Sequence, residues 1–355
     1  MTNADLKKFL VRSTVFSVIS ITLILHRAAT KHIMITDAAG VNIDRGGSEE
    51  SYKLLVDRNV SANQAGKLII PLSKSVGSDD IVLEDKYMDH ELLIYIDSRE
   101  EGFYKDNAVK TDLDIIEGAT CIAENDTGAV CLDFKLDGLY ANHSSLTETG
   151  NIEVEFFKPA EGYDRIVVVD PSGADTGTGT GFGALSEKEV SLDVAMELKG
   201  IAERDEENKV KFYYTRISDV NFEKEVATED VLRLMEETGA DMLVGIGTRA
   251  GEDSTSNGIV TTYNDSFYIR RLNNAELCNI MEKNCVMKSG SDALGMEPST
   301  EQDEVLQNST IPSCRVLVGN LNGDRDKELL ADSAYKNKLA MGIYQGIQEA
   351  FEEMR

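Results

Sequence analysis

The residues best suited to chemistry lie close together within residues 164–200. Asp170 follows four consecutive apolar residues, Ser172 comes two positions later, and Glu187 follows a glycine-rich stretch. A pair of carboxylates such as Asp170 and Glu187 can hold a metal ion or transfer a proton. A serine hydroxyl becomes a nucleophile only beside a general base. The stretch therefore offers a carboxylate pair, and a nucleophile only if a base is available.

Two familiar kinds of site are not indicated here. Ser172 does not stand in a Gly-x-Ser-x-Gly turn, and no histidine that could act as its base follows it in the chain. The histidines of the chain are His26, His32, His90 and His143. The run GTGTGFG at residues 177–183 suggests a phosphate-binding loop, but it has neither a Gly-x-Gly-x-x-Gly pattern nor a Gly-Lys-Ser/Thr ending. We interpret it as a loop that fills or covers a cleft.

A strand and a helix are expected to position these residues. The apolar run at residues 166–169 predicts a buried strand. Ser186 with Glu189 three residues later forms a capping box, and Glu187 lies in the first turn, where the helix dipole favours a carboxylate. The apolar positions of this helix share one face: Val190, Val194, Leu198 and Ile201. A strand, a loop and a capped helix open an α/β domain, and such domains place their sites at the carboxyl ends of strands.

Strands and helices continue to alternate towards the end of the chain. Apolar runs predict strands at residues 210–216, 242–246, 259–263 and 314–318. Helical spacing predicts helices at residues 223–238, 268–287 and 326–353, with a polar loop before residue 311. This order predicts the α/β class, with a mixed sheet flanked by helices.

The order of strand, Asp-Pro, glycine-rich loop, Glu-Lys and helix resembles the opening of the zinc-dependent N-acetylmuramoyl-L-alanine amidases, the type 3 cell-wall amidases. The pair Thr215 and Arg216 after the second strand and the closing segment 335–347 follow in the same order. The resemblance covers about residues 164–355 and implies the amidase-like fold. Those bacterial enzymes cut the bond between muramic acid and the first alanine of the peptidoglycan stem.

The resemblance assigns four positions to the zinc site, and three of them hold other residues here. Gly173 stands at the first zinc-binding histidine of Asp-Pro-Gly-His-Gly-Gly, and Gly247 stands at the second, after the strand 242–246. Leu317 stands at the catalytic glutamate. Glu187 matches a metal ligand, and we interpret it as a vestige that now serves as an ordinary first-turn helix residue.

A hydrolytic zinc site needs three protein ligands, an open position for water and a base. One carboxylate does not hold zinc against water, and leucine is no base. The sequence therefore predicts no intact catalytic residue, no cofactor, and an inactive amidase-like protein, a pseudoenzyme, that binds peptidoglycan or a cell-wall partner. One alternative is an active N-acetylmuramoyl-L-alanine amidase with an altered metal site, and another is an assembly protein that does not contact glycan. The altered site would draw on Glu187, Asp170 and three cysteines: Cys278, Cys285 and Cys314.

Composition excludes further classes of function. The chain has 355 residues, 41% of them hydrophobic and 28% charged, which is an ordinary globular balance. Its formal net charge of -27 argues against nucleic acid or an anionic membrane surface as a partner of the soluble part. The five cysteines form no CxxC pair, so neither a disulfide framework nor a zinc finger is predicted. Cys121 and Cys131 are the pair that could face each other across a hairpin.

The N-terminus predicts a membrane address. Lys7, Lys8 and Arg12 precede the uncharged run 13–25, and Arg27 follows it. A basic flank before a short apolar core is typical of a secretory signal or a signal anchor. Because no small-residue cleavage site follows, we expect an uncleaved anchor in the cell membrane, with the main part outside the cytoplasm. The alternative is an amphipathic or buried N-terminal helix.

These patterns divide the chain into four parts. Residues 1–32 form the signal anchor or transmembrane segment, and the turn-prone residues 33–80 form a spacer. Short alternating strands predict a small β-rich domain at residues 81–159. Residues 164–355 form the amidase-like domain. The β-rich domain loosely resembles modules that help to target amidases to the cell wall.

Overall fold

The computed structural model describes residues 34–37, 49–98, 100, 102–124, 128–173, 181–182, 185–218, 224–250, 253–266 and 270–355. The chain divides into two compact units. The first, here called the β unit, comprises the described residues of 34–137 and 142–156. The second, the α/β unit, comprises those of 138–141 and 157–355.

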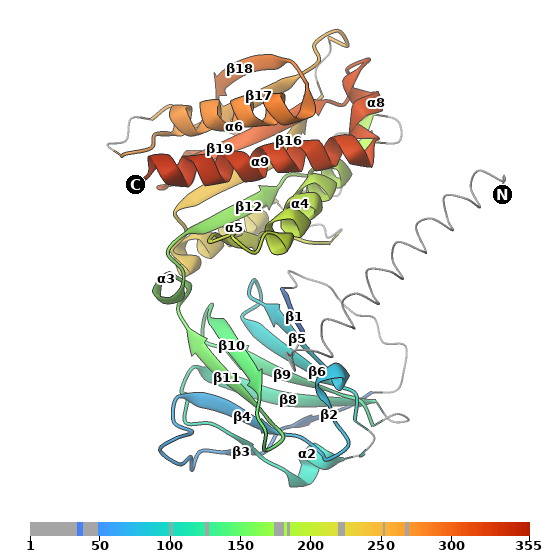
Figure 1. Cartoon of the computed structure of the whole chain (residues 1–355), viewed down its shortest axis with the longest axis vertical. Helices are drawn as coiled ribbons and strands as arrows, with labels where there is room; N and C mark the ends of the chain where they lie inside the picture. The colour runs from blue at the N-terminus through green and yellow to red at the C-terminus, as the bar shows by residue number, and fades with distance from the viewer. Residues whose placement is uncertain are drawn as a thin grey trace, which may run out of the picture. The chain divides into compact units, whose positions relative to one another are not determined.

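The β unit consists of two sheets that lie as two layers in Figure 1. One sheet has the order β1 (Met34–Asp37), β5 (Ile81–Lys86), β6 (Glu91–Ile96), β9 (Val130–Leu136), β8 (Ile116–Glu124) and β2 (Glu49–Lys53). The other has the order β10 (Ala141–Leu146), β11 (Asn151–Phe157), β4 (Lys67–Pro71), β7 (Val109–Lys110) and β3 (Val56–Asp57). Two short helices complete it, η1 (Ser78–Asp80) and α2 (Phe103–Asp106).

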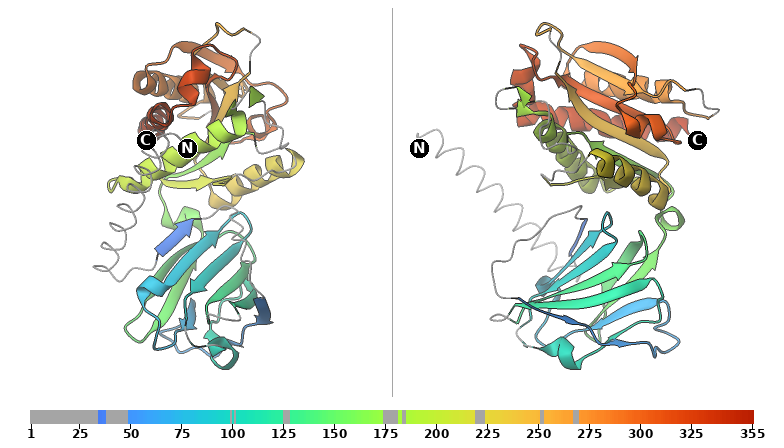
Figure 2. Two further views of the ribbon diagram at one scale, coloured as in Figure 1. Left: turned by 90° about the vertical axis from the view of Figure 1, so that its right-hand side faces the viewer. Right: turned by 180° about the vertical axis from the view of Figure 1, so that it is seen from behind.

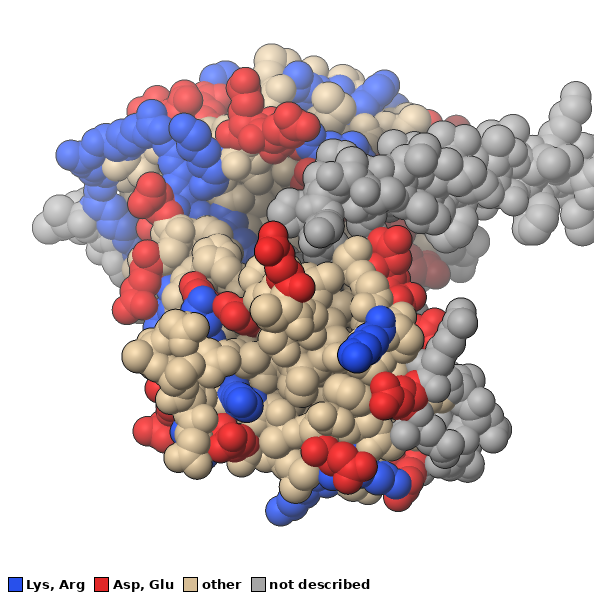
Figure 3. Space-filling model, turned by 60° about the horizontal axis from the view of Figure 1, so that its bottom comes forward, with Lys and Arg blue, Asp and Glu red and all other residues tan. Residues whose placement is uncertain are grey.

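Alternating apolar residues build the core of the β unit. Leu68 and Ile70 of β4 and Leu132 and Phe134 of β9 are fully buried, as period-2 spacing on a half-buried strand requires. In Figure 3 acidic and basic side chains are interspersed with uncharged ones on the part of this unit that faces the viewer. The unit therefore follows the pattern of a sheet with a buried and a solvated face.

Two details of the β unit differ from the sequence patterns. Strands β1, β2, β3 and β4 lie within the segment 33–80 that was expected to be a spacer. The sequence patterns missed them because they are short and pair with strands further along the chain. In the ladder of β8 and β9, Cys121 lies opposite Leu132 and Cys131 opposite Ile122. The two thiols therefore point to opposite faces of the sheet, and both are free.

The α/β unit is built on one mixed sheet. Its order is β15 (Lys211–Tyr214), β12 (Ile166–Pro171), β16 (Met242–Arg249), β19 (Ser313–Asn320), β17 (Ile259–Tyr263) and β18 (Ala293–Pro298). The four strands β15, β12, β16 and β19 are parallel, and β17 runs antiparallel to β19. The longer helices are α4 (Glu187–Arg204), α5 (Lys224–Thr238), α6 (Asn274–Ser289) and α9 (Ser333–Glu353). The shorter elements are α3 (Pro159–Gly162), α7 (Glu304–Asn308), α8 (Asp326–Leu330) and the pair β13 (Gly181–Phe182) and β14 (Leu185–Ser186).

Helices cover both faces of this sheet, as Figure 2 shows from two sides. On one face α4, α6 and α9 pack against the side chains of Val167, Val169, Val244, Ile246, Cys314 and Val316. On the other face α5 contacts β12, and α7 contacts both α5 and β19. The expected mixed sheet flanked by helices is confirmed.

The sequence patterns located most of the elements and missed some. The strand at residues 166–169 and the capped helix after Ser186 are present, with the hydroxyl of Ser186 accepting from the backbone N–H of Glu189. The loop expected before residue 311 contains β18 and α7. The segment expected to form one final helix forms two separate helices, α8 and α9. A new cap causes the break, because the Asp332 carboxylate accepts from the N–H of Ala334.

The expected membrane address is corrected. Among the described residues no helix is long and apolar enough to cross a membrane, for which about 20 apolar residues are needed. The prediction of a cell-membrane protein held by a single N-terminal anchor is therefore wrong. The segment 1–32 on which it rested lies outside the described residues.

Candidate functional site

A pocket of about 500 Å³ opens in the α/β unit at the carboxyl ends of β12 and β16, on the face covered by α5 and α7. This is the edge of a parallel sheet where α/β proteins place ligands. The charged residues that line it are Asp170, Glu187, Asp303, Glu304 and Arg315. Threonine and serine hydroxyls and the aliphatic side chains of Val231 and Val305 complete the wall. The pocket therefore carries four acidic groups and one basic group.

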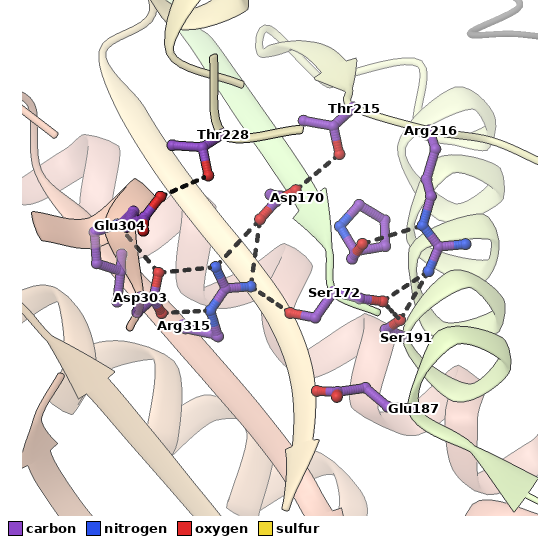
Figure 4. A network of polar contacts seen from close by, with 12 residues as sticks. Asp170, Ser172, Glu187, Ser191, Thr215, Arg216, Thr228, Asp303, Glu304 and Arg315 are labelled. Carbon is purple, nitrogen blue, oxygen red and sulfur yellow. Dashed lines mark hydrogen bonds and ion pairs between the residues drawn. The ribbon is translucent and has the colours of Figure 1, made fainter. Parts of the chain in front are cut away.

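Arg315 crosses the sheet to reach Asp170. In the parallel ladders Asp170 lies opposite Gly245, and Gly245 lies opposite Arg315. The three residues form one row across β12, β16 and β19, so they face the same side of the sheet. Because Gly245 has no side chain, the guanidinium passes over it and approaches Asp170 to 3.3 Å between Nη2 and Oδ2 (Figure 4).

Arg315 also binds a second carboxylate. Its Nε lies 2.7 Å from Oδ2 of Asp303, its Nη2 lies 3.2 Å from Oδ1 of the same residue, and its Nη1 donates to the hydroxyl of Ser172. Burial alone would lower the pKa of Arg315, but the carboxylates of Asp303 and Asp170 outweigh burial and raise the pKa above its usual value. The guanidinium is therefore charged at every accessible pH.

A second arginine holds the loop that carries Ser172. Arg216, 1% exposed, donates from Nε to the carbonyl of Pro171 at 3.1 Å and from Nη2 to the carbonyls of Ser172 at 2.8 Å and Lys188 at 2.9 Å. The same Nη2 lies 3.1 Å from the hydroxyl of Ser191 (Figure 4). Arg216 thus joins the end of β12 to the first turns of α4, which fixes the wall of the pocket.

Glu187 and two of the other predicted positions come together at this wall. The Oε1 of Glu187 accepts the backbone N–H of Thr248 at 3.0 Å. A Cβ added at Gly247 would lie 3.0 Å from that oxygen and 3.2 Å from Cδ2 of Leu317. Gly247 and Leu317 are also direct partners in the ladder of β16 and β19. The structure therefore brings Glu187, Gly247 and Leu317 into contact range, although they are far apart in the sequence.

Gly173 lies at the rim of the same pocket in a conformation that favours glycine. Its φ is 87°, in the left-handed region, and an added Cβ would lie 2.8 Å from the backbone nitrogen of Lys188. A side chain at this position would therefore need a shift of the backbone. The neighbouring residues 174–180, with the first part of the glycine-rich run, lie outside the described residues.

The residues present do not fit a zinc ion. Among the described residues no three His, Cys, Asp or Glu side chains are arranged to hold a metal. Cys278, Cys285 and Cys314 are fully buried in the core formed with α4, α6 and α9, on the face of the sheet away from the pocket. Burial raises the pKa of Cys285 to about 12, which favours the protonated thiol at neutral pH.

Sequence patterns missed Arg315 and Asp303. Asp303 lies in the polar loop, whose sequence shows no hydrophobic periodicity from which a strand or helix could be predicted. Arg315 could have been noticed, because it is the only charged residue in the apolar run Cys314 to Val318. A charged residue within a central strand needs a buried partner, and that requirement points to carboxylates at the same edge of the sheet.

The chemistry of the pocket is that of polar binding. The hydroxyls can donate and accept hydrogen bonds, and the carboxylates can accept them. For example, the hydroxyl of Thr228 donates to the carboxylate of Glu304 at 3.5 Å between oxygens. Its one described cation, Arg315, is already bonded to two carboxylates. The arrangement suits a neutral polar ligand better than an anion.

Comparison with known proteins identifies the family. A family model described as N-acetylmuramoyl-L-alanine amidase matches residues 167–349. Among solved structures, the N-acetylmuramoyl-L-alanine amidase AmiC2 of Nostoc punctiforme is 25% identical, covering 53% of this chain and 97% of that chain, with a TM-score of 0.46. The catalytic domain of CwlV from Bacillus (Paenibacillus) polymyxa var. colistinus is 24% identical, covering 54% and 99%, with a TM-score of 0.46.

The CwlD amidase from Clostridioides difficile, solved in complex with the GerS lipoprotein, is 21% identical, covering 53% of this chain and 99% of that chain, with a TM-score of 0.46. The comparison with curated proteins finds no match. The family model extends over more than half of the chain, which confirms the resemblance seen in the motifs. The chain therefore belongs to the N-acetylmuramoyl-L-alanine amidase family and is an amidase-like cell-wall protein.

Proposed function

We propose that this protein is a catalytically inactive member of the amidase family that binds peptidoglycan or a cell-wall partner through the pocket of its α/β unit. The supporting observation is the set of residues at the positions that the family uses for zinc. Glycine stands at 173 and 247 and leucine at 317, and the remaining Glu187 bonds a backbone N–H. Hydrolysis of an amide by a zinc-bound water needs three ligands and a base, and these residues supply one carboxylate.

The pocket retains what binding requires. The family acts on peptidoglycan, whose sugars and peptides are rich in hydroxyl, amide and amine groups. A pocket of about 500 Å³ with four carboxylates and several hydroxyls can form hydrogen bonds to such groups. These contacts do not depend on the catalytic residues, so the protein would still bind the ligand of the family without hydrolysing it.

The first experiment measures both properties on the full chain. Purified peptidoglycan is incubated with the protein, with and without added zinc, and the release of stem peptide and the co-sedimentation of the protein are followed. We expect co-sedimentation and no zinc-dependent release. Thr300 is exposed at the pocket rim, and Thr300→Arg is expected to weaken co-sedimentation, whereas Thr149→Arg, at an exposed threonine that does not line the pocket, leaves it unchanged.

The other outcomes identify the alternatives. Zinc-dependent release of stem peptide that is lost in Glu187→Ala would establish an active amidase with an altered metal site, and the proposal would be abandoned. Absence of any co-sedimentation would favour a role in assembly without contact to glycan. The retained Glu187 at the pocket wall is the observation that keeps the active alternative worth testing.

A further inference from the structure

Gly245 and Arg315 fit each other at the centre of the sheet. They are partners in the ladder of β16 and β19, and a Cβ at Gly245 would lie 3.0 Å from Cγ and from Nη1 of Arg315. These contacts are tighter than side chains normally accept, so any other residue at 245 would displace the guanidinium. The space beside Asp170 is therefore shaped for the side chain of Arg315.

The guanidinium neutralises the acidic side of the pocket. Its ion pairs with Asp170 and Asp303 are largely buried. The side chains of Arg315 and Asp170 are each 13% exposed, and that of Asp303 is 17% exposed. Water screens charges poorly at such depth, so two carboxylates there need a cation close by. In this chain Arg315 is that cation.

The carboxylates of Asp170, Asp303 and Glu187, which line the pocket, already accept hydrogen bonds from the protein. Oδ1 of Asp170 accepts from the hydroxyl of Thr215 at 2.9 Å, and Oδ2 accepts from Arg315. Both oxygens of Asp303 accept from Arg315. Oε1 of Glu187 accepts from a backbone N–H. A divalent cation in the pocket would have to break these bonds and would also meet the positive charge of the guanidinium.

We propose that Arg315 is a built-in cation that excludes metal ions from this site. The proposal deepens the proposed function and rests on it, because it adds an electrostatic obstacle to metal binding in the pocket of an inactive family member. The missing ligands are then only one obstacle to metal binding, because the positive charge of the guanidinium opposes a metal ion even when ligands are restored.

The test restores ligands with and without Arg315. One full-chain variant carries Gly247→His, which restores a ligand of the family, and Leu317→Glu, which places a carboxylate beside Glu187 as a substitute for the ligand at 173, where the backbone disfavours a side chain. A second variant carries Arg315→Leu in addition. A side chain at 247 requires Glu187, Ser172 and Leu317 to shift by a few tenths of an ångström, since a Cβ there would lie 3.0, 3.1 and 3.2 Å from the ends of their side chains. Binding of Zn²⁺ is measured by equilibrium dialysis, and the visible absorption of Co²⁺ reports tetrahedral coordination.

We expect one equivalent of zinc and a Co²⁺ spectrum in the triple variant, with binding at least about 100-fold tighter than in the double variant, since a unit charge a few ångströms away at a half-buried site changes affinity on that scale. The wild type is expected to give no Co²⁺ spectrum. Equal binding by the double and triple variants would overturn the proposal, and so would a folded triple variant that binds no metal. A circular dichroism spectrum like that of the wild type establishes folding.

A single substitution provides an independent measurement that needs no engineered ligand. In Arg315→Leu the carboxylates of Asp170 and Asp303 lose their cation, so millimolar Mn²⁺ is expected to raise the Tm of this variant by about 2 °C or more through binding to the folded state. The Tm of the wild type and of the exposed control Arg233→Leu is expected to stay unchanged. If millimolar Mn²⁺ leaves the Tm of Arg315→Leu unchanged, the proposal is overturned.

These outcomes are separable from those for the proposed function. Zinc binding that is equally tight in the double and triple variants removes the role of Arg315 and leaves the proposal of peptidoglycan binding untouched. Failure of the wild type to sediment with peptidoglycan removes the proposed function, whereas the dialysis results still decide whether Arg315 excludes metal.

Discussion

Replacing Arg216 by methionine is expected to loosen the part of the pocket wall formed by Pro171 and Ser172. The guanidinium is 1% exposed and joins the carbonyls of Pro171 and Ser172, at the end of β12, to the carbonyl of Lys188 in α4. Methionine occupies much of the same volume, so the cavity term is small, but it donates no hydrogen bond. The variant therefore measures the hydrogen bonds.

The magnitude follows from the number of bonds lost. Hydrogen bonds to charged groups contribute about 1.5–3 kcal/mol each, and these share one donor group, so they do not add fully. The carbonyl of Ser172 keeps the hydroxyl of Ser191 as a donor at 2.6 Å, which reduces the loss. We expect Arg216→Met to lower the free energy of unfolding by about 3–5 kcal/mol.

The assay is urea denaturation followed by the circular dichroism signal at the helical band. The longer helices α4, α5, α6 and α9 all belong to the α/β unit, so the signal reports mainly on that unit. The exposed Arg233→Met serves as the control, with an expected loss below about 1 kcal/mol because its ion pairs are on the surface. A loss below about 1 kcal/mol in Arg216→Met would refute the idea that Arg216 holds the loop to α4.

Three further predictions follow from the same unit. Gly173→Ala is expected to cost about 1–3 kcal/mol of unfolding free energy in urea denaturation, since φ is 87° and the Cβ would crowd backbone atoms; an unchanged midpoint would contradict this. Ser186→Ala should cost about 1 kcal/mol through the lost helix cap, with Ser186→Asp retaining most of the stability. A hydrogen bond from Tyr344 lowers the pKa of Asp205, so this pair stabilises the fold above the usual pKa of aspartate and the contribution is lost as pH falls through the lowered value. Tyr344→Phe should therefore raise the pKa of Asp205 in an NMR titration, and an unchanged pKa would contradict the assignment.

Local signals in the sequence were sufficient where neighbouring residues decide the structure. The cap at Ser186 and the strand of β12 depend on residues a few positions apart, and both are present. The start of α9 was missed for the opposite reason. Asp332 caps that helix within a continuous apolar period, and the period alone gives no sign of a break between α8 and α9.

Contacts across the sheet could not be read from the sequence in the same way. Arg315 and Asp170 are 145 positions apart, and they meet only because β16 separates their strands with Gly245 in the same row. Spacing within one strand says nothing about which strands are neighbours or in which register. The family motifs gave the positions 173, 187, 247 and 317, but the one arginine among the described residues that line the pocket belongs to none of them.

The pairing of Gly245 with Arg315 bears on how metal chemistry would be lost in the proposed function. An arginine at 315 beside any larger residue at 245 would be crowded, because even a Cβ would lie 3.0 Å from its atoms. A glycine at 245 opposite a short apolar residue would leave part of the sheet face uncovered, which costs packing energy. Glycine at 245 and arginine at 315 therefore stabilise the sheet only when both are present, with Asp170 as the partner of the guanidinium. In such a site, restoring single metal ligands does not restore metal binding, because the positive charge remains until Arg315 itself is replaced.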